Sequence, residues 1–91
     1  MLDRRLALDS RVALRPEPFG ALAYHYGNRR LIFLKHPDIV RVVGVLDGES
    51  TLGEVLASCG VDERRWGSFE RALSSLLDSE MLHERQPVST R

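Results

Sequence analysis

Two β-favouring runs separated by only two residues constrain the fold of this 91-residue chain more than any other feature. Residues 21–26 and 29–35 flank Gly27 and Asn28, and glycine at the first position of a two-residue loop suits a type II′ turn. The sequence therefore predicts an antiparallel hairpin in which Ala23 lies opposite Ile32. Large side chains then share one face of the hairpin, and small and aliphatic ones share the other.

One more strand is expected before this hairpin. Val12 and Leu14 alternate with other residues up to Pro16 and Pro18, which stop a helix and favour extended geometry in the residues before them. The second hairpin strand, around residues 31–34, is apolar on both faces, and the sequence predicts no later strand beside it. An unpaired strand edge of this kind invites a partner strand.

Three helices are predicted after the strands. The first follows Pro37, which suits a first helical turn, and its apolar stripe is Ile39, Val42, Val43 and Leu46. The second begins at Thr51, which forms a capping-box pattern with Glu54. Asp62 is the expected N-cap of the third and longest helix, whose apolar stripe is Trp66, Phe69, Leu73, Leu76, Leu77 and Met81.

These elements predict one domain of the α+β class, in which a three-stranded antiparallel sheet is followed by three helices. A chain of this length can bury one modest core, and the expected bounds of the domain are residues 11–83. Residues 1–10 are polar with scattered leucines and are expected to form a flexible N-terminal lead-in. Residues 84–91 contain Pro87 and small polar residues and are expected to form a flexible C-terminal tail.

The charges of the chain balance, with thirteen Lys and Arg against thirteen Asp and Glu. Nucleic-acid binding depends on an excess of positive charge, so it is disfavoured. A helix-turn-helix transcription regulator stays open as a second hypothesis. Against it, the short helix predicted around residues 52–58 contains Glu54 and no basic residue that could contact base edges.

The sequence also bears on the compartment of the protein. No apolar run approaches the roughly 20 residues that span a bilayer, and the N-terminus does not resemble a signal peptide. We therefore expect no membrane insertion and no secretion. The single cysteine, Cys59, has no partner for an internal disulfide and suits the reducing cytoplasm.

Residues that could carry chemistry have no partners at the required spacing. His25, His36 and His83 are scattered along the chain without a carboxylate or cysteine at metal-ligand spacing. His25 is expected to pack structurally within the hairpin, and Cys59 is expected to be a buried, inert thiol. A small enzyme is the third and weakest hypothesis, and we expect neither a metal nor a cofactor.

The region around the hairpin also carries a family resemblance. It reads Arg15-Pro16-Glu17-Pro18-Phe19-Gly20-Ala21-Leu22-Ala23-Tyr24-His25-Tyr26-Gly27-Asn28-Arg29-Arg30-Leu31, followed by Phe33-Leu34-Lys35. In this run the chain resembles the peptide chaperones of mycofactocin biosynthesis, which are RiPP recognition elements related to the pyrroloquinoline quinone chaperones. The resemblance extends in outline through the third helix and implies a winged helix-turn-helix fold.

The same resemblance implies a function. Such a chaperone holds the leader of the mycofactocin precursor peptide and presents it to a radical S-adenosylmethionine (SAM) maturase, which carries the cofactors. The leader adds as an extra strand beside the second hairpin strand, in a groove against the third helix. The chain itself is expected to be a monomer or a weak homodimer, because an exposed strand edge also permits self-pairing.

The expected peptide-binding residues come from this strand and the third helix. The strand supplies Arg29, Arg30, Leu31, Ile32, Phe33, Leu34 and Lys35. Phe69, Ala72, Ser75 and Leu76 are expected to border the groove, and Arg65 and Arg71 to attract acidic leader residues. A strip of small residues on this helix, Ser68, Ala72, Ser75 and Ser79, either admits the leader or packs against the chain's own sheet. Arg29 and Arg30 either contact the leader or only solvate the hairpin.

Overall fold

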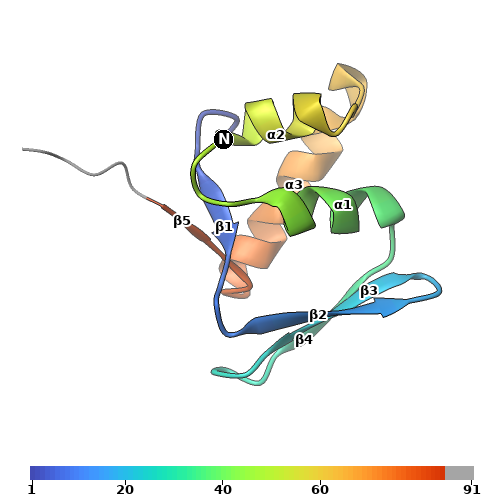
Figure 1. The fold of residues 1–91 in the computed structure, drawn as a ribbon, viewed down its shortest axis with the longest axis vertical. Helices are drawn as coiled ribbons and strands as arrows, with labels where there is room; N and C mark the ends of the chain where they lie inside the picture. The colour runs from blue at the N-terminus through green and yellow to red at the C-terminus, as the bar shows by residue number, and fades with distance from the viewer. Residues whose placement is uncertain (86–91) are drawn as a thin grey trace, which may run out of the picture.

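Two antiparallel sheets and three helices make up the computed structural model, which describes residues 1–85. The elements in chain order are β1 (Leu6–Leu8), β2 (Val12–Glu17), β3 (Gly20–His25), β4 (Leu31–Leu34), α1 (Pro37–Val45), α2 (Leu52–Ser58), the 3-10 turn η1 (Glu63–Arg65), α3 (Trp66–Asp78) and β5 (Leu82–Glu84). Figure 1 shows the three helices on one side of the β2–β3–β4 sheet. The α+β class is confirmed.

The β3–β4 hairpin has the register that the sequence predicts. Ala23 pairs with Ile32, and Leu22 pairs with Phe33. Ala21, Ala23, His25 and Leu34 are buried under the helices, whereas Leu31 and Phe33 on the opposite face are exposed. β3 lies between β2 and β4, so β4 is an edge strand.

The turn of this hairpin differs from the predicted type II′ turn. The His25 N–H donates to the Arg30 carbonyl oxygen at 2.9 Å, so four residues rather than two form the loop. The left-handed φ of +65° falls at Arg29 and not at Gly27. A side chain causes the difference, because Nδ1 of His25 accepts the N–H groups of Gly27 and Asn28 at 2.9 and 3.0 Å.

The predicted flexible lead-in is wrong for residues 6–8. β1 pairs antiparallel with β5, with Leu6 opposite Glu84 and Leu8 opposite Leu82. Leu6 and Leu82 are both buried, and their burial in the core holds the pair in place. The structure thus has two strands beyond the predicted three. Glu84, where the predicted tail begins, lies inside β5, and residues 86–91 of that tail lie outside the described residues.

The predicted helices are confirmed, with one change at a helix start. The capping box is present, because Thr51 Oγ1 accepts the Glu54 N–H and Glu54 Oε1 accepts the Thr51 N–H, at 3.3 and 2.8 Å. Asp62 caps the 3-10 turn by accepting the Arg64 N–H, so α3 itself begins later than expected. The first helix has an additional cap, the side chain of His36.

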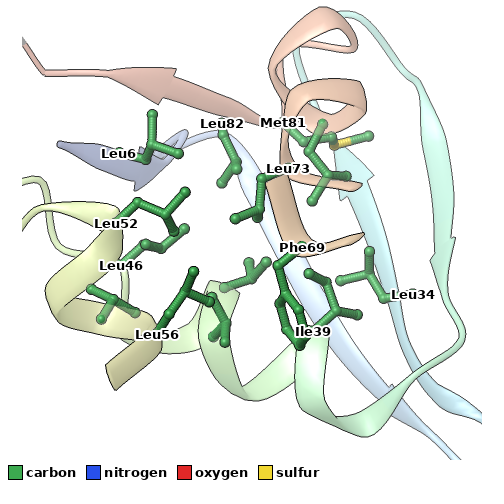
Figure 2. Packing of buried hydrophobic residues seen from close by; sticks show 14 of the residues in the cluster. Leu6, Leu34, Ile39, Leu46, Leu52, Leu56, Phe69, Leu73, Met81 and Leu82 are labelled. Atoms are coloured by element: carbon green, nitrogen blue, oxygen red, sulfur yellow. The ribbon is translucent and has the colours of Figure 1, made fainter. Parts of the chain in front are cut away.

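One hydrophobic core connects the helices with both sheets. It contains Leu6 from β1, Leu34 from β4 and Leu82 from β5, together with the buried faces of the helices. Figure 2 shows these side chains pointing toward one another, with Phe69 and Leu73 of α3 among them. The core therefore sets the position of α3 relative to the β2–β3–β4 sheet.

Candidate peptide-binding groove

The open edge of β4 is the first component of the candidate site. Residues of an antiparallel strand point their N–H and C=O groups alternately to its two sides. The Arg30 carbonyl oxygen accepts a hydrogen bond from His25 of β3, so the backbone groups of Ile32 and Leu34 also point toward β3. The backbone groups of Leu31 and Phe33 therefore point outward, away from the sheet. Among residues 1–85 no strand pairs with this side of β4.

A groove of about 620 Å³ lies between β4 and α3. The β4 side is formed by Ile32, Phe33, Leu34 and Lys35, and the next residues of the chain add His36 and Ile39. The α3 side is formed by Arg65, Ser68, Phe69, Ala72, Ser75 and Leu76. Leu34, Ile39, Phe69 and Leu76 are buried, so the base of the groove is apolar.

Two side-chain contacts join the segments before and after β4 to the two ends of α3, one contact at each end of the groove. At the end near the hairpin turn, Asn28 Nδ2 donates to the Ser79 carbonyl oxygen at 3.2 Å. At the other end, Arg65 Nη1 donates to Asp38 Oδ2 at 2.9 Å. These contacts fix the separation of the two walls at both ends.

The positive charge of Arg65 is partly offset by contacts within the chain. Its guanidinium lies 5.3 Å above the ring centroid of Phe69, in addition to its bond to Asp38. The Arg65 hydrogen bond, aided by nearby Arg41, holds the pKa of Asp38 below its ordinary value. Lys35, in contrast, has no salt bridge within residues 1–85. Lys35 is therefore the cation of the groove that is free for a partner.

The structure brings together nine of the thirteen expected site residues, namely Ile32, Phe33, Leu34, Lys35, Arg65, Phe69, Ala72, Ser75 and Leu76. The other four, Arg29, Arg30, Leu31 and Arg71, do not line the groove. Arg71 directly precedes Ala72 in α3, so its side chain leaves the helix in a different direction. Its guanidinium donates a hydrogen bond to Ser68 Oγ at 3.5 Å. Sequence reasoning left His36, Ile39 and Ser68 out of the site; the small-residue strip already pointed to Ser68.

Three of the four small residues on α3 face the groove. Ser68, Ala72 and Ser75 are exposed and line the groove, so they do not pack against the chain's own sheet. Ser79 lies at the C-terminal end of the helix, where its carbonyl oxygen accepts the Asn28 bond. The strip leaves the wall of the groove open to the close approach of another backbone.

The residues considered for chemistry lie in separate places. His25 is buried in the hairpin, where its Nδ1 has the structural role expected of it, His36 caps α1, and His83 is exposed on β5. Cys59 ends α2 and is half-buried rather than fully buried. No group of three or more potential metal ligands occurs in the described part of the chain. None of the helices described is long and apolar enough to cross a membrane.

Comparison with known proteins identifies the family. The model of the MftB peptide chaperone family matches residues 5–83. The peptide chaperone MftB of Mycobacterium tuberculosis is 44% identical over 84 residues, which cover 92% of this chain and 77% of that protein. The proteins of the same name from Mycobacterium ulcerans and Mycolicibacterium smegmatis are 44% and 41% identical, each over 88% of this chain and 73% and 78% of their own lengths.

Solved structures give no match. The family model covers most of the chain, and the relatives are named as peptide chaperones and not as enzymes. The resemblance seen in the hairpin region is thereby confirmed. The chain belongs to the MftB peptide chaperone family.

Proposed function

We propose that this chaperone binds the leader of a ribosomally made precursor peptide by strand addition to β4 and presents it to a radical SAM maturase. The observation that carries the proposal is the open edge of β4 beside an apolar groove. Strand addition supplies backbone hydrogen bonds, and a groove beside it supplies side-chain specificity. The structure has both components on the same strand.

The backbone of the leader would bond to Leu31, Phe33 and Lys35, whose N–H and C=O groups point outward. Every second leader side chain would then point toward α3, into the space between Ile32 and Ala72. Apolar leader residues suit the base of this groove. An acidic leader residue suits the end where Lys35 lies.

The maturase carries out the reaction, and the chaperone positions the precursor for it. Holding the leader makes the reacting end of the precursor effectively intramolecular, with a local concentration of about millimolar for a short tether. We place this step in the cytoplasm, where a free thiol such as Cys59 stays reduced. The acting form is a monomer whose β4 edge is free, and a weak homodimer through that edge would compete with the leader.

We further propose that the domain is a winged helix-turn-helix. In its support, α2 and α3 follow one another across the short link of residues 59–62 and the turn η1, and the β3–β4 hairpin lies beside α3. The wing in this assignment is the β3–β4 hairpin, and its outer strand is the one that receives the leader.

A bulky residue in the groove tests the proposal. Ala72 is exposed and lines the groove, so Ala72→Trp fills the space without disturbing the core. We expect leader affinity, measured by calorimetry with a synthetic leader peptide, to fall at least tenfold. The matched control is Ala57→Trp, which changes an exposed alanine of α2 outside the groove and should bind as the wild type does. Equal affinity for all three proteins would refute binding in this groove.

A further inference from the structure

The face of the β2–β3–β4 sheet that points away from the helices has no covering element among the described residues (Figure 1). We call it the outer sheet face and define it by Phe19, Leu22, Tyr24, Tyr26, Leu31 and Phe33. Leu31 is 50% exposed, Phe33 55% and Tyr26 66%. Isolated exposed apolar residues are ordinary, but a contiguous group of this kind marks a surface that meets another molecule.

The aromatic residues of the outer sheet face are held in fixed pairs. Phe19 and Phe33 meet edge to face with ring centroids 5.8 Å apart, and Tyr24 and Tyr26 do so at 5.0 Å. Rings that are already positioned lose little conformational freedom on binding. Tyr and Phe are also enriched at the centres of protein–protein interfaces.

Positive charges border this face. Arg15 shares the face with its cross-strand neighbour Leu22, Lys35 lies beside Phe33, and Arg29 lies in the hairpin turn at the end of the sheet. Glu17 pairs with Arg15 at 3.1 Å, whereas Arg29 and Lys35 have no salt bridge within residues 1–85. The border therefore carries a net positive charge.

The charge of the border decides between the possible occupants. A second copy stacked through the same face would bring like charges together, which disfavours the complex. A different protein with an apolar patch bordered by Asp and Glu would complement the face in both respects. The observations therefore favour a heterologous partner over self-association.

We propose that the outer sheet face is a docking surface for the modifying enzyme, and that the enzyme meets it with an apolar patch bordered by carboxylates. The identity of the partner as that enzyme rests on the proposed function. β4 then serves two partners: its open edge and inner side chains contact the leader, and its outer side chains contact the enzyme. Phe33 and Lys35, which also line the groove, lie at the boundary between the two partners. A leader strand would lie about 4.8 Å from β4, which places it directly beside the docked enzyme.

The test uses the purified radical SAM maturase as the probe and omits the leader, so that docking is measured without leader capture. The double variant Phe19→Ser/Tyr26→Ser removes two exposed side chains of the outer sheet face that neither line the groove nor belong to β4. We expect its affinity for the maturase, measured by biolayer interferometry, to fall at least tenfold while leader affinity stays within twofold. Val45→Ser, at the exposed end of α1, is the control and should bind as the wild type does.

Three outcomes would overturn the inference. They are unchanged maturase affinity in the double variant, an equal loss in Val45→Ser, and dimerisation of the wild type that the double variant abolishes in sedimentation experiments. Leader binding by the wild type is measured in a separate experiment. A wild-type chain that does not bind the leader peptide would refute the proposed function. The same preparation still reports on maturase docking.

Discussion

Asn28 in the β3–β4 turn and Ser79 at the end of α3 are joined by a hydrogen bond of 3.2 Å from the Asn28 side-chain amide to the Ser79 carbonyl oxygen. Neither residue lines the groove, but the bond joins the loop before β4 to the C-terminal end of α3, the two elements that form its walls. The amide oxygen of Asn28 also accepts the Arg30 N–H at 2.9 Å. One side chain thus sets both the shape of the turn and the width of the groove at this end.

Replacing Asn28 should therefore affect stability and binding together. Asn28→Ala removes both bonds and should lower the free energy of unfolding by about 1–2 kcal/mol, because a net hydrogen bond is worth about 1 kcal/mol. Leader affinity should fall severalfold, since the groove loses one of its two end contacts. Urea unfolding and calorimetric titration with the leader peptide measure the two effects.

Asn28→Asp is the matched control for this prediction. It keeps an oxygen that can accept the Arg30 N–H but has no donor for Ser79. It should keep the turn and still lose leader affinity. The account of the groove width is wrong if Asn28→Asp binds the leader as tightly as the wild type does.

The side chain of His25 also stabilises this turn. Its Nδ1 accepts two backbone N–H groups, and the ring is fully buried. His25→Ala removes both bonds and the packing of the buried ring, and it should lower the free energy of unfolding by about 2–4 kcal/mol, since a net hydrogen bond is worth about 1 kcal/mol and the loss of a large buried side chain costs more. Thermal unfolding followed by circular dichroism measures the loss.

His25→Asn tests whether the acceptor matters rather than the volume of the ring. An asparagine oxygen can accept a hydrogen bond from the N–H two residues later. The asparagine variant should recover part of the stability that the alanine variant loses. If both variants unfold at the same temperature, the hydrogen bonds to Gly27 and Asn28 do not stabilise the turn as proposed.

The hairpin register could be read from the sequence because alternation decides it. Ala21, Ala23 and Leu34 suit a buried face, and a slip by one residue would bury Tyr24 and Phe33 instead. The type of turn could not be read in the same way. It depends on side-chain hydrogen bonds that no alternation reveals, because His25 Nδ1 accepts the N–H groups of Gly27 and Asn28.

β1 and β5 could not be predicted for a related reason. Each has three residues, which is too short for a periodic pattern, and the two pair across almost the whole length of the chain. The groove could be predicted in large part, because the apolar edge strand and the small residues of α3 are both local signals. Arg71 was included for its charge, and the structure places it outside the lining of the groove.

Leu6 gives a direct test of the β1–β5 pair. It is fully buried in the core, although a flexible lead-in was expected at its position. Leu6→Ala should lower the free energy of unfolding by about 2–5 kcal/mol, the usual range for a buried leucine. Ser10→Ala, at an exposed position close by, should change it little. Equal unfolding midpoints in urea for the two variants would contradict the ordered β1.

Asp9 makes the stability depend on pH in the acid range. The side chain and backbone N–H of Arg11 bind its carboxylate and lower its pKa from 3.8 to about 2. Because the folded chain holds this group below its unfolded pKa, the contribution is fully present above about pH 4 and is lost as the pH falls to about 2.

Asp9→Asn should therefore be less stable than the wild type at pH 5 and nearly equal to it near pH 2. Urea unfolding of both proteins at pH 5, 3 and 2 measures the difference between them. A constant difference over this range would show that the Asp9 carboxylate is not stabilised by Arg11 in the folded chain.

Leader capture at β4 is tested most directly by an amide-shift titration of the isotopically labelled chain with a synthetic leader peptide. A DNA duplex at low salt is the parallel control. We predict shifts concentrated in residues 31–35 and along the α3 wall around Ala72, with no comparable response to DNA. An unresponsive groove, together with salt-sensitive DNA shifts in residues 52–58, would contradict leader capture and favour a transcription regulator.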